Sequence, residues 1–147
     1  MPRSLLPLLT QFALPHVCLV CGRYTRAKLD CCPECEATLP TLEARCLRCG
    51  LGVERSMPMC NACLLAMPSF DQSWPGFERV DMTERWLHQF RREANLTVGR
   101  FLSDIYARRL AAMGATRPDL MIPMPMHVID YCLQGFDHNR WLCKALS

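Results

Sequence analysis

The stretch CLVCGRYTRAKLDCCPECEATLPTLEARCLRCGLGVERSMPMCNAC, residues 18–63, decides the fold because it carries one cysteine pattern twice. In the first copy ten residues separate a Cys-x2-Cys pair from the next pair; these cysteines are Cys18, Cys21, Cys32 and Cys35. The second copy repeats this spacing 28 residues later; its cysteines are Cys46, Cys49, Cys60 and Cys63. A fixed period indicates two copies of one supersecondary unit.

The chemistry of thiolates explains this spacing. Two cysteines separated by two residues can hold one side of a tetrahedral ion from a tight turn, and a second pair completes the site. Four thiolates with no open position favour zinc in a structural role. Gly22 and Gly50 follow the first pair of each copy and suit the positive φ that such turns require. The sequence therefore predicts two zinc ions, with sequential pairing preferred over a crossed arrangement because each unit is then self-contained.

Disulfides, a redox pair and an iron–sulfur cluster are the alternatives for these cysteines. The N-terminus argues against secretion, because prolines interrupt the apolar residues 1–15 and Arg3 is their only positive charge. No run reaches the roughly 18 apolar residues of a membrane span. We therefore expect a cytoplasmic protein with reduced thiols and no membrane insertion. Three cysteines lie outside the pattern and are interpreted as buried or incidental thiols: Cys31, Cys132 and Cys143.

The second half has the periodicity of helices. The spacing predicts a helix over 81–92 with Met82, Trp86 and Phe90 on one stripe. A second helix is predicted over 96–113, ending at Gly114. Its apolar stripe comprises Val98, Phe101, Leu102, Ile105 and Leu110.

A short buried strand is predicted at Asp119–Ile122, closed by the turn 123–127 with its two prolines. A final helix is predicted to start near Phe136 or Asp137, with Trp141, Leu142 and Leu146 on one side. One strand between helices indicates an α/β domain, but one strand cannot form a parallel sheet. The sequence therefore predicts a small, metal-stabilised module of turns and hairpins followed by an incomplete α/β segment.

Four motifs resemble those of a known family. The first is Cys18-Leu19-Val20-Cys21-Gly22, which follows a lead-in at Leu8–Pro15, and the second is Trp86-Leu87-His88-Gln89-Phe90-Arg91. The third is Ile122-Pro123-Met124-Pro125-Met126-His127, and the fourth is Gln134-Gly135-Phe136-Asp137-His138. Their order resembles that of the ComF/GntX family of competence and DNA-utilisation proteins. That family joins a double zinc ribbon to a type I phosphoribosyltransferase-like domain. The resemblance implies a lead-in or N-terminal helix at 1–17, the ribbons at 18–64 and the first portion of that α/β domain at 65–147.

This sequence departs from the family in its last motif. Gln134 stands where the family usually has arginine, Asp137 where it has asparagine and His138 where it has glutamine. Residues 128–133 lack the family's arginines, which would weaken a phosphate contact made by those cations. The loop that grips phosphoribosyl pyrophosphate has no counterpart here, so we expect a C-terminally truncated chain without transferase activity.

The resemblance implies an accessory role in DNA uptake or utilisation, with a protein of the uptake machinery as partner and single-stranded DNA as a further candidate. Candidate contacts to nucleic acid or phosphate are Arg23, Arg26, Lys28, Arg48, Arg91 and Arg92. The alternative is an ordinary solvated face, because acidic residues accompany the arginines of the ribbons and the net charge is only +3. His127 and His138 have no partner motif and are interpreted as turn or surface histidines.

Two other functions compete with this one. The chain could be the N-terminal fragment of a phosphoribosyltransferase-type enzyme, as the single strand suggests. It could also be a protein–protein interaction module that uses apolar helices and a methionine cluster, Met121, Met124 and Met126, to dock a partner.

Overall fold

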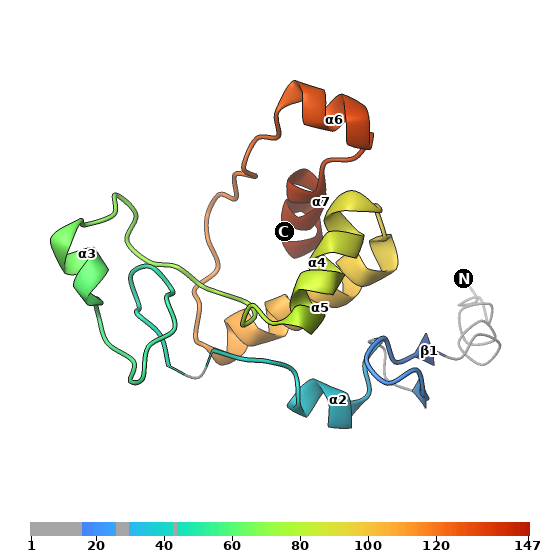
Figure 1. Ribbon diagram of the computed structural model, residues 1–147, viewed down its shortest axis with the longest axis horizontal. Helices are drawn as coiled ribbons and strands as arrows, with labels where there is room; N and C mark the ends of the chain where they lie inside the picture. The colour runs from blue at the N-terminus through green and yellow to red at the C-terminus, as the bar shows by residue number, and fades with distance from the viewer. Residues whose placement is uncertain (1–15, 26–29, 43) are drawn as a thin grey trace, which may run out of the picture. The chain divides into compact units, whose positions relative to one another are not determined.

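The computed structural model describes residues 16–25, 30–42 and 44–147. The chain divides into two compact units, which meet in sequence between Leu39 and Pro40. The first unit contains β1 (His16–Val17), β2 (Tyr24–Thr25) and α2 (Pro33–Ala37). The second contains α3 (Asn61–Leu65), α4 (Asp81–Arg92), α5 (Leu96–Ala112), α6 (Val128–Gln134) and α7 (His138–Leu146), as Figure 1 shows. Of the lead-in expected at 1–17, all but the two residues of β1 lie outside the described residues.

The first unit is a metal-site hairpin with very little apolar core. β1 and β2 pair antiparallel, with His16 opposite Thr25 and Val17 opposite Tyr24. The chain then reaches α2, which begins at Pro33. Proline suits this first position because the N–H that it lacks would have no partner within the helix. The buried apolar residues described in this unit are three cysteines and one leucine: Cys18, Cys31, Cys35 and Leu39. So small a core cannot hold the unit together without a metal.

Helices α4 and α5 confirm the two amphipathic predictions. α4 spans the predicted residues, and Thr83 anchors its start by accepting from the Val80 amide at 3.0 Å and donating to the Glu78 carbonyl at 2.8 Å. Asn95 caps α5 by accepting from the Val98 amide at 3.2 Å, and Gly114 follows its end with a φ of +71°.

The core of the second unit lies where α5 packs against α4 and against α7, and Figure 1 shows these three helices grouped together. Trp86 meets Phe101 edge-on with ring centroids 5.0 Å apart, and Phe90 meets Trp141 at 5.3 Å. Gly99 makes this packing possible, because a Cβ there would come within 2.5 Å of the Phe90 ring and 3.2 Å of Trp141. A glycine inside a helix is thus explained by close approach of its neighbours.

The predicted buried strand at Asp119–Ile122 is wrong. Residues 115–127 have no regular secondary structure, and Leu120 and Ile122 are 73% and 79% exposed. A strand needs a neighbour to accept its backbone hydrogen bonds, and the described residues contain no further strand beyond the β1–β2 pair. This segment therefore lies open, with its apolar side chains exposed.

The C-terminal region contains one helix that the sequence analysis missed. α6 covers Val128–Gln134, capped by His127 at its start and by Gly135, with a φ of +63°, at its end. The predicted final helix is confirmed as α7, whose first amides are capped by Asp137 through a 3.0 Å bond from the Arg140 amide. Its predicted Trp141 contacts the core.

Replacing Gly99 with valine tests this packing. We expect Gly99→Val to lower the free energy of unfolding by about 2 kcal/mol or more, because overpacking a core costs about 1–3 kcal/mol. Ala107→Val is the matched control, since Ala107 is exposed on the same helix and carries only the β-branched penalty of about 0.5 kcal/mol. Thermal unfolding of both variants measures the difference, and equal effects would contradict the packing argument.

Candidate metal centres

Each cysteine set gathers its sulfurs into one cluster. In both clusters the four Sγ atoms lie within 4.8 Å of one another. In the first, Cys21 and Cys32 bring their sulfurs to 3.9 Å. In the second, Cys49 and Cys60 are 3.8 Å apart and Cys46 and Cys63 are 4.0 Å apart. The clusters follow the sequential pairing that the sequence analysis preferred.

These distances fit zinc. Four sulfurs placed about 2.3 Å from a tetrahedral ion lie about 3.8 Å from one another. A disulfide would bring two sulfurs to about 2 Å, and all the cysteines described are free thiols. In a four-iron cluster each thiolate binds a different iron, which would spread the sulfurs apart. Both clusters therefore fit one zinc ion each, with no ligand position left open.

The two centres are built by the same backbone, displaced by 28 residues. The Gly22 amide donates to the Cys18 carbonyl at 2.8 Å, and the Gly50 amide donates to the Cys46 carbonyl at 2.9 Å. Both glycines have the positive φ predicted for them, +72° and +78°. The helix that carries the last ligand repeats as well, because α2 begins directly after Cys32 and contains Cys35, and α3 begins directly after Cys60 and contains Cys63.

Backbone amides prepare one thiolate in each cluster. Burial raises the pKa of Cys18, but amide donors from Cys32, Cys21 and Val20 outweigh it and lower the pKa to about 6. The corresponding donors, Cys49 first and then Cys60 and Arg48, lower the pKa of Cys46 to about 6 against its burial. These amides stabilise the charged sulfur, as a thiolate ligand requires.

The last cysteine of each cluster shows the opposite shift. Burial, followed by hydrogen bonds with Cys49 and Cys60, raises the pKa of Cys63 to about 12. A side-chain hydrogen bond with Cys32, followed by burial, raises the pKa of Cys35. Four sulfurs this close cannot all ionise by themselves, so a cation must compensate the charge.

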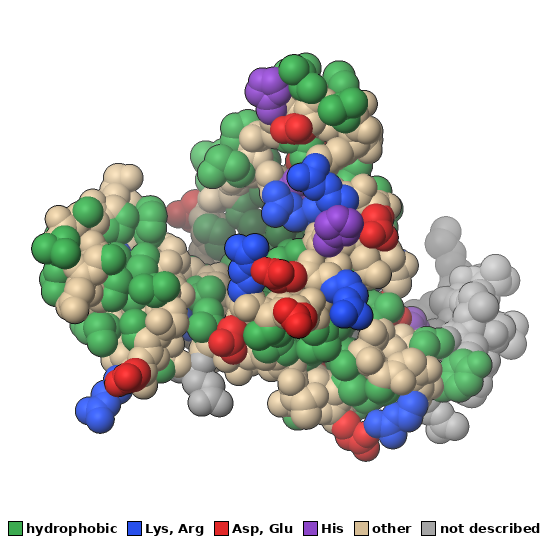
Figure 2. Space-filling model, viewed as in Figure 1, with side chains coloured by type: hydrophobic (Ala, Val, Ile, Leu, Met, Phe, Trp, Pro, Cys, Tyr) green, Lys and Arg blue, Asp and Glu red, His purple; other side chains and the backbone are tan. Residues whose placement is uncertain are grey.

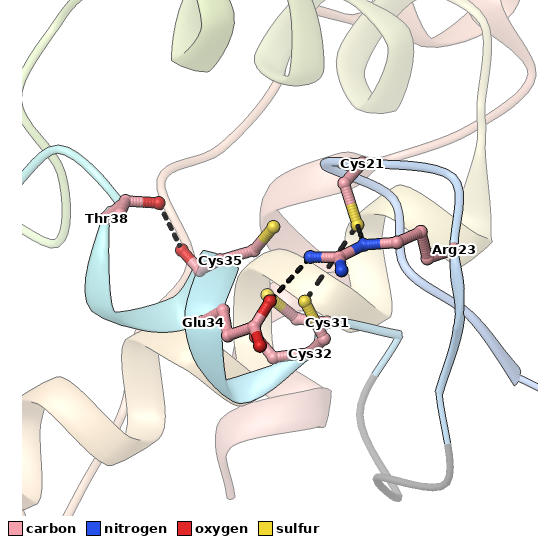
Figure 3. A network of polar contacts seen from close by, with 7 residues as sticks. All are labelled: Cys21, Arg23, Cys31, Cys32, Glu34, Cys35 and Thr38. Atoms are coloured by element: carbon pink, nitrogen blue, oxygen red, sulfur yellow. Dashed lines mark hydrogen bonds and ion pairs between the residues drawn. The ribbon is translucent and has the colours of Figure 1, made fainter.

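Polar contacts distinguish the first centre. Figure 3 shows Arg23 between the Cys21 sulfur and the Glu34 carboxylate. Its Nε–H donates to Sγ at 3.5 Å and its other nitrogen pairs with Glu34 at 2.5 Å. The hydrogen bond to Cys21 and then the one to Glu34 raise the pKa of Arg23. This role of Arg23 was missed, although its position two residues after a ligand and the acid between Cys32 and Cys35 were visible in the sequence.

An apolar shell distinguishes the second centre. Val53, Met57 and Met59 pack against its buried cysteines. Arg48, in the first turn of this centre, donates to the Pro68 carbonyl at 3.0 Å and pairs with Asp71 at 3.3 Å. Arg45 lies over the Trp74 ring at 5.3 Å. These two arginines fasten the second centre to the segment that leads into α4.

The candidate phosphate contacts fall into three groups. Arg23 and Arg48 are engaged at the metal centres by the contacts given above. Arg26 and Lys28 lie outside the described residues. Arg91 and Arg92 lie exposed in the last turn of α4, and the structure brings them together with Gln134 and His138 around one pocket of 220 Å³.

The cysteines and histidines outside the repeated pattern have ordinary surroundings. Cys31 is 1% exposed, and burial raises its pKa to about 12, as expected for a buried thiol. Cys132 is exposed and Cys143 half-buried. His127 caps α6, whereas His138 packs edge-on against Phe90. Burial, then the positive charge of Arg91, lowers the pKa of His138, so that this ring is neutral at pH 7.

Residues 9–64 match the family model of the double zinc ribbon domain. This segment is a double zinc ribbon. Over 143 residues the chain is also 26% identical to the DNA utilization protein YhgH of Shigella flexneri, covering 92% of this chain and 56% of that protein. The chain thus spans little more than half the length of this curated relative. No solved structure matches the chain significantly.

These matches confirm the resemblance to the ComF/GntX family. Within the described residues, no helix has both the length and the apolar composition needed to cross a membrane.

Serine variants test the two centres separately. We expect the wild-type chain to bind two zinc ions, and Cys18→Ser and Cys46→Ser to bind one each, because a cysteine-to-serine change removes a thiolate from a closed four-ligand site. Loss of one centre should remove stability on the order of 10 kcal/mol from its ribbon. Native mass spectrometry counts the metal. Cys132→Ser, at an exposed cysteine outside both clusters, is the control and should retain both ions.

Proposed function

We propose that this chain is a zinc-ribbon accessory protein of DNA uptake or utilisation that acts in the cytoplasm. In this proposal the C-terminal turn of α4 contacts phosphate groups of single-stranded DNA. The relative's name supports the process, since that protein is a DNA utilization protein. Arg91 and Arg92 support the contact, and they are the single observation that carries the proposal.

These two arginines differ from Arg23 and Arg48 in having no carboxylate partner among the described residues. They are exposed neighbours at a helix C-terminus, and they line both a pocket of 610 Å³ along α4 and the pocket of 220 Å³ beside α6. Guanidinium groups with free N–H donors suit phosphate, which they recognise through charge and a bidentate fork.

Gln134 completes the smaller pocket and explains a departure from the family. With its amide oriented to satisfy both neighbours, Gln134 donates to the Arg91 carbonyl and accepts from the Arg92 guanidinium, each at 3.1 Å. The neutral amide therefore joins α6 to the end of α4 and holds Arg92 in place. An arginine at position 134 would add a third positive charge to this pair.

The electrostatic field here is moderate. Asp130 lines the small pocket, and Asp81 and Glu84 line the larger one, where Glu84 already pairs with Arg79. A surface on which carboxylates lie beside the arginines suits contact with one or two phosphates of a single strand rather than with a long duplex. We therefore expect weak, strongly salt-dependent binding.

Fluorescence anisotropy with a labelled single-stranded oligonucleotide tests this function. Arg91→Gln/Arg92→Gln should weaken binding about tenfold at low salt and make the dependence on salt shallower, by about 1.4 in log–log slope, because two phosphate contacts are lost. Arg55→Gln/Arg100→Gln removes the same charge from exposed positions elsewhere and should bind like wild type. Absence of binding at low ionic strength, or equal losses in both double variants, would overturn the proposal.

A protein partner is the second candidate, supported by the exposed apolar surface around α6. It comprises Leu120, Ile122, Met124, Val128, Ile129 and Leu133, each more than 60% exposed. In Figure 2 hydrophobic side chains cover much of the tip formed by α6. Exposed apolar surface of this extent is typical of a surface that another protein segment covers. Here we propose a protein of the DNA uptake machinery as the occupant.

A photo-crosslinkable residue distinguishes this candidate. Placed at Leu133 in cells, it should give a discrete cross-linked band, whereas the same residue at the exposed Ala107 of α5 should not. Bands of equal intensity at the two positions, or none at Leu133, would count against a docking surface there.

The finer assignment of residues 65–147 to a phosphoribosyltransferase-like α/β domain is also a proposal. The alignment with the relative supports it, because it extends well beyond the ribbons to 92% of the chain. We propose no transferase activity for residues 1–147 alone, and consumption of phosphoribosyl pyrophosphate with a nucleobase would overturn that statement.

A further inference from the structure

We propose that the two zinc centres are chemically unequal: Cys21 is the thiolate at which electrophiles and chelators open the first centre, and Arg23 sets the rate of that reaction. The second centre, in this proposal, is the inert one. The inference concerns the metal centres only and does not depend on DNA binding.

The 28-residue repeat makes the two centres directly comparable, because each position has a counterpart. Cys21 corresponds to Cys49, Arg23 to Leu51 and Glu34 to Ala62. The backbone bonds at these positions are preserved, since the Cys18 amide donates to Arg23 and the Cys46 amide donates to Leu51, both at 2.8 Å. The centres therefore differ in side chains around a shared frame.

Exposure is the first difference. Cys21 is exposed. Its counterpart Cys49 is less accessible, because it is half-buried, and the other three ligands of the second centre are buried. Val53, Met57 and Met59 complete the enclosure of that centre. A reagent in water thus reaches a zinc-bound sulfur most directly at Cys21, because attack requires access to the thiolate.

Charge is the second difference. Four thiolates and one zinc ion carry a net charge of −2, which makes the sulfurs electron-rich. Arg23 donates an N–H to the Cys21 sulfur at 3.5 Å, and Glu34 holds the same guanidinium at 2.5 Å (Figure 3). A charge-assisted hydrogen bond withdraws density from the sulfur and lowers its nucleophilicity. Leu51 and Ala62 can supply neither contact in the second centre.

The reaction can be written for N-ethylmaleimide. The Cys21 sulfur attacks the maleimide double bond, a carbon–sulfur bond forms, and the neighbouring carbon takes a proton from water. The resulting thioether is a weak ligand, so the zinc–sulfur bond breaks. Cys18, Cys32 and Cys35 would then hold the ion with three thiolates, and a chelator would remove it more readily.

Native mass spectrometry during exposure to N-ethylmaleimide and a chelator tests this order, because it reports zinc and adducts together. In a Cys132→Ser background, which removes the exposed cysteine outside both centres, we expect the first adduct among the eight ligands on Cys21, located by peptide mapping, with loss of one zinc while the second is retained. Arg23→Leu, which copies the second ribbon, should bind two zinc ions and lose the first about fivefold faster, because the charge-assisted bond to the Cys21 sulfur is lost. Arg23→Lys keeps the charge without the planar fork and should fall between the two.

A spectroscopic measurement separates this role from a structural one. In the cobalt-substituted protein, removal of an N–H donor from a thiolate should shift the sulfur-to-cobalt charge-transfer band to lower energy. We expect this shift in Arg23→Leu and its absence in Leu51→Ala, the change at the counterpart position. Equal loss of both zinc ions, a first adduct on Cys49, or an unchanged rate and spectrum in Arg23→Leu would each overturn the proposal.

Discussion

The repulsion among four thiolates held within 4.8 Å is the constraint on which the ribbons depend. Without a cation the last cysteine of each cluster resists ionisation: hydrogen bonds with neighbouring thiols and burial raise the pKa of Cys35, burial and such bonds raise that of Cys63, and the charge of a neighbouring thiolate adds to both shifts. A zinc ion converts this repulsion into the main stabilising interaction of segments that have almost no apolar core. The backbone amides that lower the pKa of Cys18 and Cys46 make that charged state easier to reach.

The second unit combines this metal dependence with an ordinary aromatic core. Phe90 lies among Trp141, Phe136 and His138, and Gly99 lets its ring approach α5. Arginines connect this core to the second ribbon, because Arg45 lies over Trp74 and one of its nitrogens contacts the sulfur of Met113 at 2.7 Å. The second ribbon is therefore anchored by its own ligands and by neighbours from the helical segment.

Features set by local chemistry could be predicted from the sequence. Ligand spacing identified both metal centres and their pairing, and apolar periodicity identified α4 and α5, with Gly114 marking the end of α5, because each signal lies within a few residues of its element. The strand at Asp119–Ile122 failed because an apolar run specifies burial only when a neighbour exists to cover it. Helix α6 was missed although Gly135 marked its end, since its apolar residues face outward and give no core stripe. The Arg23–Glu34 contact joins residues eleven apart through a metal turn, and residue periodicity cannot show it.

The placement of the arginines narrows where this protein can meet an anion. The sequence alone made the arginines of the ribbons candidates for contact with phosphate. In the structure Arg23 donates to Cys21 and Glu34, and Arg48 donates to Asp71 and to the Pro68 carbonyl. A guanidinium already paired in this way gains little from a phosphate, because it must first give up an existing partner. Arg91 and Arg92 have no carboxylate partner among the described residues; Arg92 donates to the amide of Gln134, and this amide and the His138 ring are neutral. Arg23 and Arg48 therefore stabilise the metal centres and their turns, whereas Arg91 and Arg92 have cationic donors to offer.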